Sequence, residues 1–386
     1  MSYLLWLLLP VAAASGWLVA WYQKQQGLRN FLVPDYYFKG LNYLLNEEPD
    51  KAIDVFIKLI DVDSDTVETH LALGILFRRR GEVNRAIRIH QNLIARTSLP
   101  PQQRNLARFE LGQDFRHAGL LDRAEDLFQD LVASNTHQVL ALRQLLEIYQ
   151  QEQDWEKAIG TAQQLASADN EPMQTVIAQY YCEQAEVSLR QSDGYAAQPL
   201  IQQALKVDPN CVRASLLEGQ LAFQKRNLDH AIYAFQRVER QDPDYLTEVI
   251  EPLQTCYQEL GQVNEFTDYL RLLLERYDSI TLMLMLAKII RQYEGEQQAA
   301  NFIVKQLHQS PSLRGIDYLL DLALEKTSSI SRDHLLLLKD MTRQLLINKP
   351  AYKCNHCGFT TRKLHWQCPS CKQWNTLKPT QGIDGE

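Results

Sequence analysis

Four cysteines near the C-terminal end of this 386-residue chain have the spacing of a metal site. They form two C-x2-C pairs separated by ten residues, Cys354-Asn-His-Cys357 and Cys368-Pro-Ser-Cys371. Two tight turns that face each other can bring four thiolates to the corners of a tetrahedron, which suits zinc or a single iron ion. We therefore predict one metal ion, Zn or Fe, in this four-Cys site. Unrelated cysteines or two disulfides are the alternative, and the spacing argues against them.

The residues around the two pairs are those expected in such turns. Gly358 ends the first turn, and a backbone without Cβ can direct its amide toward a sulfur. Lys372 stands in the corresponding place of the second turn, where glycine would fit best. His356 and His365 could each replace a sulfur, but four cysteines already complete a site. We expect both histidines to face solvent or to lie behind the ligands.

Net charge separates this C-terminal tail from the rest of the chain. The whole chain carries 40 basic and 47 acidic residues, a formal charge of −7, which argues against a general nucleic-acid binder. From Lys349 onward the charge is +4, so the preceding part carries −11. A basic tail of this kind suits an acidic protein face or a phosphate-bearing membrane surface, and it equally suits simple solubility.

An apolar segment at the N-terminus predicts a transmembrane anchor. Residues 3–22 contain no charge and, at the rise of an α-helix, span about 30 Å, the thickness of a bilayer core. Trp6 lies near one end and Trp17 and Trp21 near the other, as amphipathic rings prefer. A cleaved signal peptide is the alternative, but no Lys or Arg precedes the apolar run. We expect an uncleaved anchor over residues 1–22 and a linker over residues 23–34.

The charges that flank the anchor predict its orientation. Lys24 and Arg29 follow the span, so the positive-inside rule places the body of the protein in the cytoplasm. Free thiolates gathered for a metal fit the same reducing compartment. The other cysteines, Cys182, Cys211 and Cys256, lie singly in helical stretches, and we expect them to be small buried residues.

Residues 35–310 repeat a pair of small residues twelve positions apart. A small residue on each of two helices lets their backbones approach closely, as a helical hairpin requires. In the pair Leu146/Ala158 only the second residue is small, and in the pair Gln254/Phe266 neither residue is small. The full pairs are Gly40/Ala52, Gly74/Ala86, Gly112/Ala124, Ala185/Ala197, Gly219/Ala231 and Ala287/Ala299.

The period of 33 to 39 residues matches tetratricopeptide repeats, two helices each, stacked into a superhelix. About eight repeats fit the segment, and Gly81, Gly119 and Gly261 fall at turns between paired helices. Tyr149, Trp155, Tyr180, Tyr181 and Phe235 are assigned mainly to packing. Such a solenoid offers a long rigid surface that holds another polypeptide.

Residues 311–348 are predicted as terminal helices that carry the metal-binding tail, residues 349–386. The linker that follows Lys349-Pro350 is short, so we expect the tail to pack against the last repeats. Trp366 and Trp374 are expected to form the small core of the tail, with docking onto the repeats as the alternative. The predicted fold is therefore all-α, with a rubredoxin-like or zinc-ribbon metal domain at its C-terminus.

No catalytic constellation competes with this interpretation. The chain has no phosphate-binding loop, no H-E-x-x-H and no G-x-S-x-G motif. We therefore expect a protein that is not an enzyme and that binds no small-molecule substrate.

Three segments resemble one family. Leu7 to Ala14, Arg80 to Gln91 and the tail from Cys354 to Asp384 resemble the lipopolysaccharide assembly protein B (LapB, also called YciM) family, in the same order of anchor, repeats and rubredoxin-like tail. The resemblance implies a single-pass inner-membrane regulator with its body in the cytoplasm. Its implied role is to promote degradation of LpxC, the deacetylase of lipid A synthesis, by the membrane protease FtsH. Other lipopolysaccharide-synthesis or regulatory membrane proteins are further implied partners.

Two other functions stay open at this stage. The first is a scaffold that gathers lipopolysaccharide-synthesis enzymes at the membrane without delivering any to a protease. The second is a rubredoxin-type iron centre that carries electrons, since a four-Cys site accepts iron as readily as zinc. The chain has no recognisable flavin or nicotinamide unit, which argues against the second.

Overall fold

The computed structural model describes residues 67–383 apart from residues 98, 171, 327–330 and 348, together with residues 39, 42, 43, 48, 51, 55 and 385. The predicted anchor, the linker and the Gly40/Ala52 pair lie outside the described residues. Within the described part of the chain, no helix is both long enough and apolar enough to cross a bilayer.

The chain divides into two compact units, Met1–Glu152 and Gln153–Glu386. The described part of the first unit consists of helical hairpins, in which α5 pairs with α6 and α7 with α8, and α9 packs on α8. Its helices are α5 (Val67–Arg79), α6 (Val83–Ile94), α7 (Pro101–His117), α8 (Leu121–Ala133) and α9 (Gln138–Glu152).

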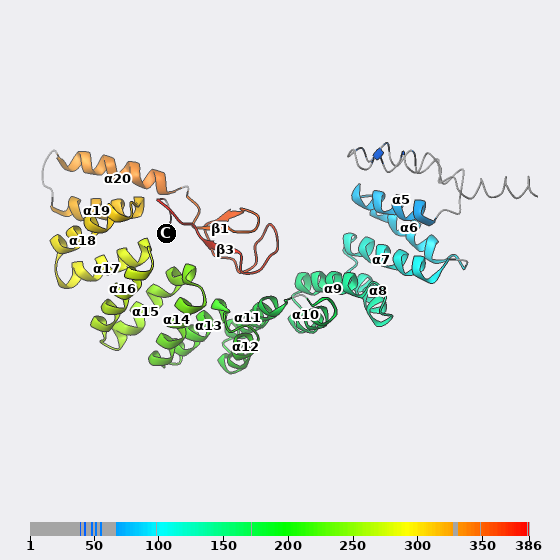
Figure 1. Cartoon of the computed structure of the whole chain (residues 1–386), viewed down its shortest axis with the longest axis horizontal. Coiled ribbons are helices and arrows are strands. Elements are labelled where there is room, and N and C mark those ends of the chain that lie inside the picture. Colours follow the sequence, from blue (N-terminus) through cyan, green and yellow to red (C-terminus); the bar gives the residue numbers. More distant parts are fainter. Residues whose placement is uncertain are drawn as a thin grey trace, which may run out of the picture. The chain divides into compact units, whose positions relative to one another are not determined.

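The second unit continues the helical pattern and ends in a small sheet (Figure 1). Consecutive helices pair from α11 to α20, and one 3-10 turn, η1 (Pro243–Tyr245), precedes α15. Its helices are α10 (Trp155–Asp169), α11 (Gln174–Arg190), α12 (Gly194–Val207), α13 (Val212–Gln224), α14 (Leu228–Gln241), α15 (Leu246–Glu259), α16 (Val263–Arg276), α17 (Ile280–Tyr293), α18 (Glu296–Gln309), α19 (Leu313–Lys326) and α20 (Ser331–Ile347).

The sheet contains three short antiparallel strands, β1 (Tyr352–Cys354), β2 (Thr360–Thr361) and β3 (Leu377–Pro379), in the order β2-β1-β3. Tyr352 lies opposite Thr361 on one side and opposite Pro379 on the other. The predicted fold of all-α tetratricopeptide repeats with a C-terminal metal-binding ribbon is confirmed.

The small-residue pairs lie inside the hairpins, as the spacing predicts. Ala86, Ala124, Ala197, Ala231 and Ala299 are fully buried. In each hairpin, the small residue of the first helix faces a larger side chain of the second helix. That larger side chain lies four residues after the buried alanine. A Cβ on Gly219 would lie 2.4 Å from Cε1 of Phe235, and one on Gly112 would lie 2.7 Å from Cε1 of Phe128. The glycine therefore makes room for a buried ring.

Where the first residue of the pair is alanine instead of glycine, the side chain four residues after the second residue is smaller than phenylalanine. Ala185 is followed in this register by Ile201 and Ala287 by Ile303, and all four residues are buried. The first and second helices thus adjust to each other: glycine stands opposite an aromatic ring and alanine opposite isoleucine.

The expected packing role of the aromatic residues is confirmed for Tyr149, Tyr180 and Phe235, which are buried. Trp155 and Tyr181 are half-buried. Cys182, Cys211 and Cys256 are buried and free of disulfides, as predicted. Two of them are not isolated in space, however, because the Sγ atoms of Cys182 and Cys211 lie 3.8 Å apart.

Candidate metal centre and its docking surface

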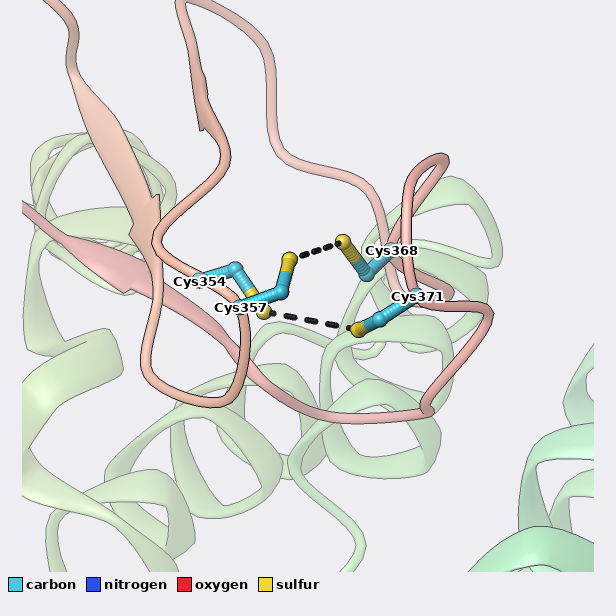
Figure 2. Close-up of side chains that lie close together, drawn as sticks. All are labelled: Cys354, Cys357, Cys368 and Cys371. Atoms are coloured by element: carbon cyan, nitrogen blue, oxygen red, sulfur yellow. Dashed lines mark hydrogen bonds between the residues drawn. The ribbon is translucent and has the colours of Figure 1, made fainter. Parts of the chain in front are cut away.

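The four cysteines of the predicted site lie together in the ribbon. Cys354 is the last residue of β1 and Cys357 lies in the turn that follows it, while Cys368 and Cys371 come from a second turn that faces the first (Figure 2). All four sulfur atoms lie within 4.8 Å of one another. Among the described residues this is the one group of His, Cys, Asp or Glu side chains gathered closely enough to hold a metal ion.

Matching backbone conformations build the two turns. Gly358 has φ +77° and its amide donates to the carbonyl of Cys354, 2.9 Å away. Lys372 has φ +60° and its amide donates to the carbonyl of Cys368, also at 2.9 Å. The second turn therefore adopts the same left-handed conformation as the first, although a lysine tolerates it less well than a glycine does.

Hydrogen bonds favour the thiolate form of Cys354. Burial disfavours its ionisation, but the hydroxyl of Thr376 and the amides of Cys357 and His356 outweigh burial and lower the pKa to about 6. Thr376 Oγ1 lies 3.3 Å from Cys354 Sγ. Thiolates are the form that binds zinc or iron, so this environment prepares the residue for metal binding.

The neighbouring thiols also oppose one another. The amide of Gln373 favours the thiolate of Cys371, but burial and the adjacent sulfurs outweigh this and raise its pKa to about 12. Four negative charges within a few ångströms repel strongly unless a cation lies among them. Four sulfur ligands at these distances fit a divalent or trivalent metal ion such as zinc or iron.

Neither histidine of the tail joins the cluster. His356 and His365 are both exposed, as expected for solvent-facing residues. The buried core of the ribbon consists of Cys354, Cys368 and Leu377, with Tyr352, Phe359, Leu364 and Cys371 packed around it.

The two tryptophans do not form that core, so the first expectation for them is wrong. The ring of Trp366 lies 5.4 Å from the ring of Tyr245, and the guanidinium of Arg213 lies over its face. The ring of Trp374 meets Tyr180 edge-on at 5.8 Å. Both tryptophans contact the helical repeats because those repeats offer a larger apolar surface than the small ribbon does.

Polar contacts hold the ribbon on η1 and the start of α15. The hydroxyl of Tyr245 donates to the carbonyl of Leu377 at 2.8 Å and lies 3.0 Å from Asn375 Oδ1. Lys378 pairs with Asp242, and its ammonium lies 4.1 Å from the centre of the Tyr245 ring. Burial, followed by the nearby carboxylates, raises the pKa of Tyr245 well above its usual range.

The ribbon also reaches the end of the helical array. Arg362 donates to the carbonyl of Ile347 at the end of α20, and the amide of Leu313 in α19 donates to the carbonyl of Ile383 at 3.0 Å. The ribbon packs against the repeats, as the short linker predicts. Its contacts are wider than expected, since they begin at α11 and α13 rather than at the last repeats.

A buried charged cluster in the first unit has no counterpart in the sequence analysis. Arg78 Nη1 lies 2.8 Å from Asp114 Oδ1, and Arg78 Nη2 lies 2.6 Å from Glu110 Oε2. Asp114 also accepts from His90 Nδ1 at 2.5 Å. The ring of His90 faces Gly74, in the place that phenylalanine takes opposite Gly112 and Gly219. A polar residue four positions after the buried alanine of the second helix was the sequence signal that could have revealed this cluster.

Profiles of known families match both parts of the fold. Residues 352–379 match the profile described as a rubredoxin metal binding domain, and residues 71–139 and 182–245 match that of the tetratricopeptide repeat. Among solved structures, a chain of the Naa15/Naa10 complex bound to HypK-THB resembles this one with a TM-score of 0.42 and 12% identity. That match covers 82% of this chain and 47% of the other.

Curated relatives match over nearly the whole chain, among them proteins of two organisms. Lipopolysaccharide assembly protein B of Escherichia coli K12 is 41% identical over 386 residues, which cover 99% of each chain. The protein of the same name from Haemophilus influenzae is 36% identical over 391 residues, covering 97% of this chain and 98% of the other.

Proposed function

The chain belongs to the lipopolysaccharide assembly protein B family, and on that basis we propose that it is a membrane-anchored adaptor that regulates lipopolysaccharide synthesis. Its proposed action is to bring the LpxC deacetylase to the FtsH protease at the inner membrane. The observation that carries the proposal is the helical array of the second unit with a ribbon fixed against it, a rigid surface suited to holding a polypeptide.

The adaptor mechanism requires no chemistry from this chain. A surface that binds a soluble enzyme beside a membrane protease raises the local concentration of one for the other. We propose that residues 3–22 supply the membrane anchor, with the body in the cytoplasm, because this apolar span is followed by Lys24 and Arg29. The protein is then not an enzyme, and the deacetylase and the protease supply the catalysis.

The metal has a structural role in this proposal. We propose that Cys354, Cys357, Cys368 and Cys371 hold one Zn or Fe ion, whose contribution when bound is to fix the two turns of the ribbon. The ribbon has a very small core of its own, so its fold depends on that ion. A folded ribbon then keeps Trp366 and Leu377 in place against Tyr245.

Depletion of the protein tests the adaptor function directly. The half-life of LpxC is measured after translation is stopped, in cells with the protein and in cells depleted of it. A longer half-life after depletion supports the adaptor. An unchanged half-life with altered membrane recruitment of lipopolysaccharide-synthesis enzymes supports the scaffold instead.

Cysteine variants then connect the metal to the function. Cys368→Ser is expected to behave like depletion, while Cys256→Ala, a change at a buried cysteine outside the cluster, retains the normal LpxC half-life. The remaining alternative, a rubredoxin-type electron carrier, is tested by anaerobic purification followed by metal analysis and a reduction test. A redox-silent zinc site excludes the electron carrier.

A further inference from the structure

Two buried cysteines of the second unit lie in contact, although no disulfide joins them. Cys182 lies on α11 and Cys211 directly precedes α13, so the two belong to the first helices of neighbouring repeats. Their Sγ atoms are 3.8 Å apart, and the residues are 0% and 2% exposed. The adaptor function uses neither thiol, and 29 positions of sequence separate them. The fold therefore brings together two thiols that the sequence keeps apart.

The backbone around Cys211 allows the two sulfur atoms to come closer. A disulfide bond places its sulfurs about 2 Å apart, so a small movement is enough to form one here. Cys211 lies outside α13, with extended backbone angles of φ −72° and ψ 95°, and it follows the exposed residues Pro209 and Asn210. A turn at the surface opens more readily than the interior of a helix. The same segment therefore gives a small oxidant access to the pair.

The surroundings make the two thiols chemically unequal. The hydrogen bond from Cys182 lowers the pKa of Cys211; burial opposes this, while the amide of Ala214 and the charge of Arg213 support it. Burial, followed by the bond to Cys211, raises the pKa of Cys182 well above its usual range. A thiol that ionises readily beside one that stays protonated is the usual arrangement of a reactive cysteine and its resolving cysteine.

A buried polar side chain beside the pair also distinguishes it from ordinary apolar packing. Gln179 Nε2 lies 3.8 Å from Cys211 Sγ, and Gln179 Oε1 accepts from Arg213 Nη1 at 3.3 Å. Gln179 is 1% exposed and Arg213 is 3% exposed. A cysteine that serves only as a small apolar residue needs no such donor at its sulfur. Cys256 is of that kind, since burial raises its pKa to about 11 and it lies in a different apolar cluster.

The pair lies close to the docked ribbon (Figure 1). Tyr180, two positions before the first cysteine, contacts the ring of Trp374. Arg213, two positions after the second cysteine, lies over the ring of Trp366. A bond between the two sulfurs therefore ties the repeat that contacts one tryptophan to the repeat that contacts the other. In a reducing compartment, bonds of this kind form transiently and report on oxidants.

We propose that Cys182 and Cys211 form a redox modification site, a dithiol that a hydroperoxide converts to a disulfide and that small thiols restore. The site goes beyond the adaptor function, because it concerns a covalent change of this chain rather than the polypeptides it binds.

The proposed reaction proceeds in two steps. The thiolate of Cys211 attacks one oxygen of the hydroperoxide, the O–O bond breaks, and the other oxygen leaves with a proton as water or an alcohol. Cys211 is then a sulfenic acid, and the sulfur of Cys182 displaces its hydroxyl, which leaves as water with the Cys182 proton. The two thiols lose two electrons to the hydroperoxide. Two molecules of a small thiol such as glutathione return them by thiol–disulfide exchange.

Peptide mapping of the full chain in native membranes tests this site. The membranes are treated with hydrogen peroxide, the remaining free thiols are alkylated under denaturing conditions, and the chain is digested with trypsin. Cleavage after Arg190 and Lys206 separates the two cysteines, so only a covalent bond holds their peptides together. The linked peptides are expected to rise at least tenfold over untreated membranes and to disappear after incubation with glutathione. Cys256 is expected to stay alkylated.

Single substitutions provide the second arm. Cys182→Ala is expected to remove the linked peptides and to leave Cys211 as a sulfenic acid that dimedone traps, while Cys256→Ala leaves the link unchanged. Cys256 is the matched control, since it is a buried cysteine of the same unit without a neighbouring sulfur in the described part of the chain.

The unaltered chain gives the decisive result, so the test does not depend on how well a variant folds. Free thiols at both positions after peroxide treatment would overturn the proposal, as would linkage of either cysteine to a different one. Equal oxidation of Cys256 would also overturn it, because the contact between the two sulfurs would then give no selectivity. None of these readouts depends on LpxC turnover, so the two proposals fail separately.

Discussion

The hydroxyl of Tyr245 donates to the carbonyl of Leu377, 2.8 Å away, and so connects the η1 turn to β3 across 132 positions of sequence. Tyr245 is fully buried, and its ring contacts both Trp366 and the ammonium of Lys378. One side chain of the repeats therefore makes both an apolar and a polar contact with the docked ribbon.

Tyr245→Phe is expected to loosen the ribbon without removing its metal. The ring is kept, but the carbonyl of Leu377 loses its donor inside a buried interface, which costs about 1–3 kcal/mol. Limited proteolysis should cut residues 349–383 several-fold faster, with unchanged metal content. Tyr233→Phe is the control, since that tyrosine is 56% exposed and lies on α14. Equal cleavage of both variants would mean that the hydroxyl does not hold the ribbon.

Gly219→Ala should destabilise its hairpin by about 1–3 kcal/mol, because the new Cβ lies 2.4 Å from the buried ring of Phe235. The measurement is the urea midpoint followed by circular dichroism. Adding Phe235→Ile is expected to recover most of the loss, since the pair then matches Ala185 and Ile201. Gly160→Ala serves as the control. Nothing lies within 4 Å of its Cβ position, so this change in a helix is neutral or slightly stabilising.

The sequence predicts the hairpins well because a small pair at a fixed spacing reports where two backbones meet. It does not reveal which side chain fills the space beside the glycine, since that side chain lies on the second helix, four residues after the second small residue. It also reveals only some of the turns. Gly81, Gly119 and Gly261 have positive φ as expected, but Ser192 and Arg226 take the same conformation at the same place in their repeats. Repeat geometry overrides residue preference there.

The gathering of the four cysteines was predictable because they are close in sequence. The docking of Trp366 and Trp374 was not, since it depends on residues more than a hundred positions away that meet only in the folded chain. A sequence does not distinguish an aromatic residue that is buried in the tail's own core from one that is buried against the helical repeats. The charged cluster of Arg78, His90 and Asp114 was missed because it joins three helices, α5, α6 and α7, without a motif spacing.

Thr376→Val should weaken metal binding by about tenfold, the usual effect of losing a group that orients a ligand. The Thr376 hydroxyl helps to lower the pKa of Cys354 to about 6, so protons compete with the metal for this sulfur more strongly as the pH falls through that value. The variant raises this pKa, and metal release should move to higher pH. Chelator competition measured from pH 5 to 8 provides the test.

Thr360→Val is the matched control for that experiment. Thr360 lies exposed on β2, outside the ribbon core. If both threonine variants release metal at the same pH as the unaltered chain, the hydroxyl of Thr376 has no part in metal binding.

Removing the metal should release the ribbon from the repeats and leave the first unit unchanged. Without the ion the two cysteine turns lose their shape, and Leu377 and Trp366 no longer hold their places against Tyr245. Hydrogen exchange in α15, measured with a chelator under reducing conditions, should then become at least several-fold faster, because η1 and the start of α15 lose their cover. Exchange in α7 is the internal control, since that helix belongs to the other unit. Unchanged exchange in α15 would show that the ribbon stays docked without its metal, and the proposed structural role of the ion would then be wrong.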